Sequence, residues 1–155
     1  LLGGGVHVSI RGTFDKERGR SGYVTRGTYD LESAGAFYDK LLAQCGAVRA
    51  YTLERMIAWC NDPVKPMFGI TGPSEGNAAT PGNGVMVATL CNDAEQVRAV
   101  HSLALSLGAE NAGTPDEFGG TSFGGYFRDL ADNKFCAFVM PPDTSDLSSD
   151  EVETP

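Results

Sequence analysis

Basic residues are scarce in this sequence. Lysine and arginine together number 12 among 155 residues, against 20 aspartates and glutamates, so the formal net charge is -8. A surplus of negative charge repels nucleic acid phosphates, and DNA and RNA are therefore not expected partners. No apolar run approaches the roughly 20 residues of a membrane-spanning helix, and glycines interrupt the start where a signal peptide would be continuously apolar. We expect a soluble, cytoplasmic protein without a membrane partner.

Cysteine and histidine are also sparse. The cysteines are widely spread, with no C-x-x-C pair, at Cys45, Cys60, Cys91 and Cys136. This spacing does not fit a secreted disulfide scaffold and favours reduced, mostly buried thiols. The only histidines are His7 and His101, and the second falls among apolar residues of a predicted helix. For both we expect a surface or packing role rather than metal ligation or general-base catalysis.

Motifs for covalent catalysis are absent. No G-x-S-x-G elbow occurs, and the glycine-rich stretch FGGTSFGG, residues 118–125, has the spacing of neither a Walker motif nor a dinucleotide fingerprint. This stretch is predicted to be either a mobile flap over a pocket or a plain surface loop. Asp116, Glu117 and Glu54 stay open as acid–base candidates, although most acids of so acidic a chain are solvated.

The two ends differ in composition from the middle of the chain. Residues 1–20 contain an alternating stretch, Val6 to Ile10, and a cluster of charges, and are predicted to be a leader segment or an extra edge strand. Residues 141–155 carry five acids and no basic residue, and are predicted to be an acidic, disordered tail. Between these ends we expect a single domain over residues 21–140.

The middle of the chain shows the same plan twice, with an offset of about sixty residues. In the first copy, Tyr23 to Thr28 is predicted to be a strand. Asp30 is placed to cap the helix that follows, apolar residues recur at helical spacing, and Gly46 ends the helix.

The second copy repeats these signals. Val85 to Leu90 is predicted to be a strand, and Asp93 with Gln96 three residues later resembles a capping box. A helical pattern follows and ends at Gly108. The linker between the copies, residues 72–84, contains prolines and glycines that interrupt regular structure, as expected of a hinge between two modules.

Each predicted helix is followed by strand-like segments. These are Val48 to Leu53, Met56 to Cys60 and Met67 to Thr71 in the first half, and Tyr126 to Asp129 and Lys134 to Met140 in the second. A strand, a helix and then a run of strands cannot bury its faces as a doubly wound sheet. The expected class is therefore α+β, with helices outside an open, curved mixed sheet.

Four stretches of this pattern are similar to one known family. They read YVTRGTYDLESAGAFYDKLL from Tyr23, TPGNGVMVATL from Thr80, AEQVRAVHSLALSLGA from Ala94 and GGYFRDLADNKFCAFV from Gly124. On these stretches the chain resembles the glyoxalase, bleomycin-resistance and extradiol-dioxygenase group, the vicinal oxygen chelate superfamily. The resemblance implies two βαβββ modules, about residues 21–72 and 84–140, that form an open cup.

Members of this superfamily commonly hold a metal ion in the cup through histidine, glutamine or glutamate side chains. The positions that match those ligands are Tyr23, Met86 and Cys136, with Phe68 or Gly69 at the fourth. Thioethers and buried thiols usually fill gaps in a core, and a thiol in apolar surroundings keeps its proton. The resemblance therefore implies a member that lacks the usual metal ligands, and no cofactor is expected.

The cup is expected to provide an apolar, aromatic pocket for a small molecule, with plain core packing as the alternative. The predicted pocket residues are Tyr23, Thr25, Trp59, Phe68, Met86, Ala88, Phe123, Cys136 and Phe138. Arg26 and Arg128 are second-rank candidates for contact with an anionic group, because an arginine on a strand near the surface is usually solvated or paired with an acid.

Three functional hypotheses follow. The leading one is a metal-independent protein that binds a hydrophobic or aromatic ligand in the cup, as some members of the superfamily sequester a drug. The second is a lyase or isomerase similar to glyoxalase, with an atypical site. The third is a protein-interaction module whose cup is filled by its own side chains. The resemblance also implies a homodimer.

Overall fold

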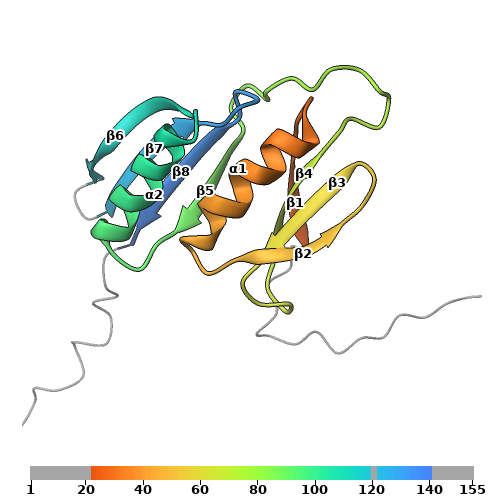
Figure 1. Cartoon of the computed structure of the whole chain (residues 1–155). Helices are drawn as coiled ribbons and strands as arrows, with labels where there is room; N and C mark the ends of the chain where they lie inside the picture. The colour runs from red at the N-terminus through yellow and green to blue at the C-terminus, as the bar shows by residue number, and fades with distance from the viewer. Residues whose placement is uncertain (1–21, 120–121, 141–155) are drawn as a thin grey trace, which may run out of the picture.

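The protein consists of two modules of the same plan in a computed structural model that describes residues 22–119 and 122–140 (Figure 1). The first contains β1 (Tyr23–Gly27), α1 (Leu31–Ala43), β2 (Val48–Thr52), β3 (Met56–Cys60) and β4 (Met67–Thr71). The second contains β5 (Met86–Leu90), α2 (Ala94–Ser106), β6 (Glu110–Phe118), β7 (Ser122–Arg128) and β8 (Lys134–Val139). The predictions for residues 1–20 and 141–155 lie outside the described residues. No helix in the described ranges has the length and apolar character of a membrane span.

The strands form two separate mixed sheets. Their orders are β1-β4-β3-β2 and β5-β8-β7-β6, so β1 and β5 are equivalent edge strands of the two modules. β1 runs parallel to β4, and β5 runs parallel to β8, whereas the other neighbours are antiparallel. Both helices lie on the same side of the sheets, and the opposite faces are left open (Figure 1). The predicted α+β fold with two βαβββ modules is confirmed.

Both helices begin directly after the predicted caps, whereas α1 ends at Ala43 and α2 at Ser106, shortly before the predicted glycines. Asp30 Oδ1 accepts a hydrogen bond of 2.9 Å from Ser33 N at the start of α1, and Asp93 Oδ1 accepts one of 2.7 Å from Gln96 N at the start of α2. Gly46 and Gly108 follow the helix ends with φ of 72° and 103°, in the left-handed region that favours glycine. These local signals explain why the repeat could be recognised in the sequence.

One strand of the second module was missed by the sequence prediction. β6 contains Gly113 and Pro115, and its pairing with β7 is interrupted between Asn111 and Gly113 and again between Gly113 and Asp116. Such an irregular edge strand has no alternating apolar pattern. The prediction of a flap or loop over residues 118–125 was also wrong for most of the stretch, because Phe118 ends β6 and residues 122–125 begin β7.

Tyr38 of α1 lies at the centre of the core and contacts both modules. Its ring is 4.7 Å from the ring of Phe68 and 5.7 Å from Trp59 in the first sheet, measured between centroids. On the other side it is 5.8 Å from Phe135 of β8. Phe135 in turn stacks on Phe127 at 5.4 Å, so one aromatic cluster joins the two sheets beneath the helices.

A buried polar network, which we call the module junction, accompanies this cluster. Tyr38 Oη donates a 2.6 Å hydrogen bond to Oδ2 of Asp129. The other oxygen, Oδ1, accepts from the backbone N–H groups of Ala131 at 2.9 Å and Asn133 at 2.8 Å. The Asn133 side chain then donates to Gly27 O at 3.0 Å, across the boundary between the modules. Burial, followed by the charge of Asp129, raises the pKa of Tyr38 well above its ordinary value, so its hydroxyl remains a donor.

The module junction outweighs the surface ion pairs. Arg49 and Asp39 meet at 2.7 Å, but both side chains are more than a third exposed, and such pairs contribute less than about 1 kcal/mol. A buried carboxylate that accepts several hydrogen bonds contributes more, because removing it leaves buried donors without partners at roughly 1–3 kcal/mol each. Among the polar interactions, the hydrogen bonds of Asp129 between the modules therefore contribute more to stability than the surface ion pairs.

Replacement of Asp129 by asparagine should destabilise the protein. Asparagine replaces one accepting oxygen of Asp129 with an NH2 group, which then faces groups that donate hydrogen bonds. We therefore expect Asp129→Asn to lower the free energy of unfolding by roughly 2 kcal/mol or more in urea denaturation. Asp132→Asn is the matched control, because Asp132 is exposed and its left-handed φ of 63° suits asparagine. Equal, small effects of both substitutions would contradict the assignment.

Candidate ligand-binding site

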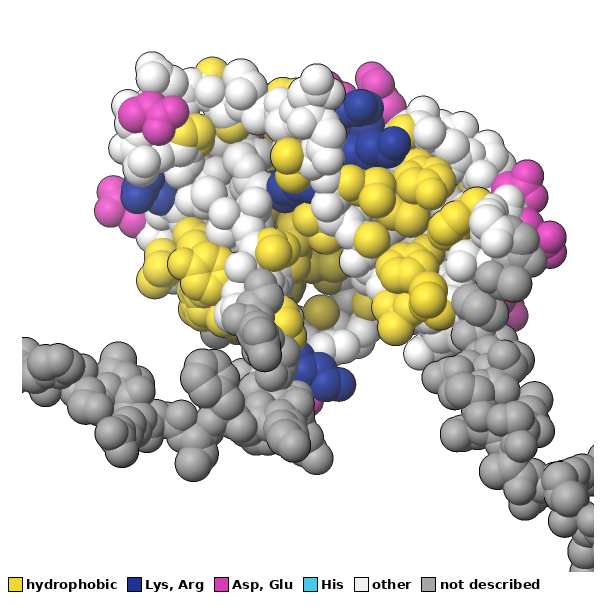
Figure 2. Space-filling model, turned by 180° about the vertical axis from the view of Figure 1, so that it is seen from behind, with side chains coloured by type: hydrophobic (Ala, Val, Ile, Leu, Met, Phe, Trp, Pro, Cys, Tyr) yellow, Lys and Arg dark blue, Asp and Glu magenta, His cyan; other side chains and the backbone are white. Residues whose placement is uncertain are grey.

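Large apolar side chains are exposed on β1 and β5, the edge strands where the two modules meet. Tyr23 of β1 and the β5 residues Met86 and Leu90 are 55%, 42% and 62% exposed, an unusual degree for large apolar side chains on strands. Figure 2, which shows the side opposite the helices of Figure 1, displays hydrophobic side chains gathered around a hollow. Exposed apolar surface that surrounds a hollow is typical of a binding site.

A groove of about 350 Å³ runs between the two modules. We call it the central groove. Val24 of β1, Trp59 of β3, Phe68 of β4 and residues 87–90 of β5 line it, together with residues at the end of α1. Its walls include the edge strands β1 and β5, which belong to different sheets. Its lining contains no charged residue and no histidine.

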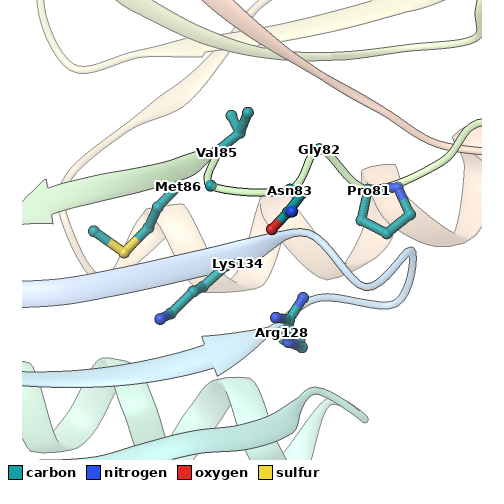
Figure 3. Close-up of a pocket in the computed structure, with 8 residues that line it drawn as sticks. Pro81, Gly82, Asn83, Val85, Met86, Arg128 and Lys134 are labelled. Carbon is teal, nitrogen blue, oxygen red and sulfur yellow. The ribbon is translucent and has the colours of Figure 1, made fainter.

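A second pocket, of about 550 Å³, lies at the start of β5 and is called the basic pocket below. It is lined by the turn residues 81–85, by Met86, and by the side chains of Arg128 and Lys134 (Figure 3). Arg128 ends β7 and Lys134 begins β8, and the two residues are paired in the antiparallel register. The two basic residues therefore come from paired positions of neighbouring strands.

The structure distributes the predicted pocket residues over several places. Trp59, Phe68 and Ala88 line the central groove, and Met86 lines the basic pocket. The strand registers put Tyr23, Thr25, Cys136 and Phe138 at positions of the open face, outside both of these lining sets. Phe123 lies under the guanidinium of Arg98 from α2, hence on the helix-covered face. Whether these residues contact a ligand stays a prediction.

The aromatic residues do not form the filled cup of the third hypothesis. That arrangement would pack Trp59, Met86 and Phe138 together. Trp59 is 1% exposed and packs against Tyr38 and Phe68, whereas Met86 is 42% exposed and lies on the other module. The hollow between the modules is therefore not closed by these three side chains.

The side chains that the resemblance matches with the superfamily's metal ligands are poor donors for a divalent ion. Tyr23 is an exposed phenol and Met86 an exposed thioether. Cys136 is 3% exposed, and burial raises the pKa of its thiol, so the thiolate needed for ligation is disfavoured. Among the residues with described positions, no three histidine, cysteine, aspartate or glutamate side chains are grouped as a metal site requires.

Neither His101 nor Arg26 belongs to the open face. His101 is buried, and its Nε2 lies 3.2 Å from Asn111 Oδ1 and 3.1 Å from Tyr126 O, so the predicted packing role is confirmed. Arg26 is also buried, on the helix-covered side. Its charge lowers the pKa of Tyr38, against the larger effects of burial and Asp129, which places it beside the module junction.

Lys134 was missed as a site residue. In the sequence analysis, Lys134 was only one residue of a predicted strand, within the last of the four stretches similar to the superfamily. Only its pairing with Arg128 across the loop reveals that it lines a pocket. Arg128 had been considered for an anionic group, and it pairs with Asp132 at 3.2 Å.

The thiols should differ in reactivity. Cys136 and Cys91 are buried; burial raises the pKa of Cys136, and a hydrogen bond with Cys45, followed by burial, raises that of Cys91. We expect iodoacetamide at neutral pH to modify the half-buried Cys60 well before Cys136 and Cys91, as followed by peptide mass spectrometry. Urea should remove the difference. Fast modification of Cys136 in the folded protein would contradict the placement of its thiol.

Comparison with known proteins supports a family assignment. A scan against protein-family models and a search of curated proteins give no match. Among solved structures, a glyoxalase/bleomycin resistance protein from Albidiferax ferrireducens is 32% identical over 77% of this chain and 98% of its own, with a TM-score of 0.71. This level of identity over nearly the whole relative indicates common descent.

More distant structures share the fold. A glyoxalase/bleomycin resistance protein/dioxygenase family enzyme from Burkholderia phytofirmans is 19% identical, covering 77% of this chain and 97% of its own at a TM-score of 0.64. Lactoylglutathione lyase from Agrobacterium tumefaciens is 17% identical, with 76% and 90% covered and a TM-score of 0.56. With the paired βαβββ modules and the closer relative, these matches make the chain a member of the glyoxalase/bleomycin resistance protein superfamily.

Proposed function

We propose that this protein binds a hydrophobic or aromatic small molecule in the central groove, and that it does so without a metal ion. The observation that carries the proposal is the groove itself, an apolar channel of about 350 Å³ with Trp59 and Phe68 in its wall. The phenol, thioether and buried thiol at the positions of the superfamily's metal ligands support the metal-independent part.

The chemistry of the lining favours binding over turnover. A lyase or isomerase needs a group that moves a proton. The side chains that line the central groove include no carboxylate, imidazole or amine, and the thiols of Cys45 and Cys60 are the only titratable groups among them. They do offer aromatic and aliphatic surface. At about 25 cal/mol per Å², a ligand that buries roughly 200 Å² of apolar surface gains about 5 kcal/mol before the cost of association is counted. Modest affinity for many apolar compounds is therefore expected.

A fluorescent apolar probe tests this proposal. N-phenyl-1-naphthylamine is uncharged and brightens in apolar surroundings, so we expect saturable fluorescence with the purified protein, unchanged after EDTA treatment or after addition of zinc, nickel or magnesium. Ala88→Arg should weaken binding by roughly tenfold or more, because an apolar ligand would have to bury an unpaired guanidinium.

Ala36→Arg provides the matched control, because Ala36 lies on an exposed face of α1, outside the central groove. It should leave the affinity unchanged. Absence of saturable binding by the unmodified protein would overturn the proposal, and so would binding that requires a divalent ion. Equal effects of the two arginine substitutions on the affinity would indicate that the ligand does not bind beside β5.

We also propose that a second copy of the chain covers the exposed apolar rim of the open face. Tyr23 and Leu90 lie exposed on the edge strands β1 and β5, and exposed apolar surface of this kind commonly marks an interface. Symmetric pairs are the commonest assemblies of soluble proteins, and a second copy would shield the edges of both sheets.

Light scattering tests the pairing. We expect a mass of twice the 16.4 kDa chain, and a shift toward the monomer in Tyr23→Glu, which places a charge in the rim. Val64→Glu is the control, because Val64 is similarly exposed but lies in the loop between β3 and β4. A monomeric unmodified protein, or a dimer insensitive to Tyr23→Glu, would contradict this second proposal.

A further inference from the structure

The basic pocket concentrates positive charge in an acidic protein. The whole chain carries 12 basic residues against 20 acids, yet Arg128 and Lys134 line one pocket whose lining includes no aspartate or glutamate. Its volume of about 550 Å³ exceeds the 350 Å³ of the central groove. Two cations that line one concave surface attract a negatively charged group.

Lys134 has no acidic partner among the residues with described positions. Its Nζ lies over the ring of Tyr126, 5.1 Å from the centroid, and no carboxylate oxygen of the described chain comes within 4 Å. The ring holds the side chain in place without neutralising its charge. Lys134 is therefore positioned to meet an anion.

Arg128 is partly engaged. Its Nη1 donates to Asp132 O at 2.8 Å and to Asp132 Oδ1 at 3.2 Å, whereas its Nε and Nη2 donate to no residue in the described ranges. Glu110 faces Arg128 in the register of β6 and β7 and further offsets its charge. Arg128 consequently supplies directed donors, and Lys134 supplies most of the net positive charge.

The turn on the opposite wall adds neutral donors. Gly84 has a φ of 80°, which places the segment before β5 in a tight turn closed by a 3.2 Å hydrogen bond from Val85 N to Gly82 O. The backbone N–H groups of Asn83 and Gly84 donate to no described residue. Asn83 also lines the pocket with its side-chain amide (Figure 3). Backbone N–H groups beside cations are suited to carboxylate or phosphate oxygens.

β5 connects the basic pocket with the central groove. Met86, its first residue, lines the basic pocket, and residues 87–90 line the groove. From Met86 to Leu90 the strand extends about 13 Å, at roughly 3.3 Å per residue. One elongated molecule can thus have a charged end at Lys134 and an apolar body along the strand.

We propose that the basic pocket binds the oxyanion head group, a carboxylate or a phosphate, of an amphipathic ligand whose apolar part occupies the central groove. This inference rests on the proposed function and narrows its ligand class from apolar compounds to acidic amphiphiles.

Displacement of N-phenyl-1-naphthylamine by three molecules with the same ten-carbon chain tests the proposal. Decanoate and decyl phosphate carry an oxyanion, and decanol is their neutral counterpart. Decanoate or decyl phosphate should displace the probe at a concentration at least about fivefold lower than decanol. A difference of this size is expected from one charge-assisted hydrogen bond at a partly exposed site. Whichever of decanoate and decyl phosphate displaces the probe at the lower concentration identifies the preferred head group. Added salt should reduce this difference between the acids and decanol, because it screens the charges.

Substitution of Lys134 locates the effect. Lys134→Gln should remove most of the advantage of the acids over decanol without weakening decanol or the probe, and Lys134→Arg should retain it. Lys40→Gln, the same change of charge on the exposed side of α1, should have no effect. Thermal melting curves of the variants verify that they are folded.

The outcomes separate this proposal from the broader one. If the probe binds but decanol competes as well as both acids, or if Lys134→Gln weakens acids and decanol alike, the head-group site is wrong and apolar binding stands. If the probe does not bind the unmodified protein at all, the proposed function fails and this inference fails with it.

Discussion

The buried contact of Tyr38 with Asp129 is the interaction on which the arrangement of this protein depends. The two sheets share no ladder of hydrogen bonds, since β1 and β5 are both edges. Among the described residues, packed side chains and hydrogen bonds from side chains hold the modules together. Asp129 anchors them by fixing the β7–β8 loop beneath α1, and the Asn133 side chain donates to the backbone oxygen of Gly27 of β1. In a low-dielectric interior such a network is costly to leave half satisfied, so it defines a single relative position of the two modules.

The groove is a consequence of that junction. Aromatic side chains close the space between the sheets near Tyr38, while further along β1 and β5 the space stays open and apolar. Its walls come from both modules, so neither module alone can form it. The scaffold thus has a groove lined without charged residues between its modules, and apolar binding there is what we propose.

The sequence predicted much of the fold, because its signals are local and occur twice. Asp30, Asp93, Gly46 and Gly108 mark the helices by hydrogen bonds and backbone angles that depend on near neighbours. β6 escaped because an edge strand with two irregularities needs no alternating pattern.

The candidate site was less predictable. Alternation along a strand tells which side chains share a face but not which face the helices cover. Trp59 and Phe68 were expected to face the cup, and they do line the central groove, but from the helix-covered core, where they pack against Tyr38. Lys134 was invisible as a site residue because its role depends on Arg128 and on a turn about fifty residues earlier in the chain.

The central claim, that the ligand lies between the edge strands of the two modules, can be tested most directly by nuclear magnetic resonance. Amide and indole N–H signals of the metal-free, isotope-labelled protein would be followed during titration with N-phenyl-1-naphthylamine. The account predicts shifts concentrated at Val24, Phe68, the Trp59 indole and residues 87–90. Shifts confined to the outer faces of α1 and α2, or shifts that arise only after a divalent ion is added, would contradict it.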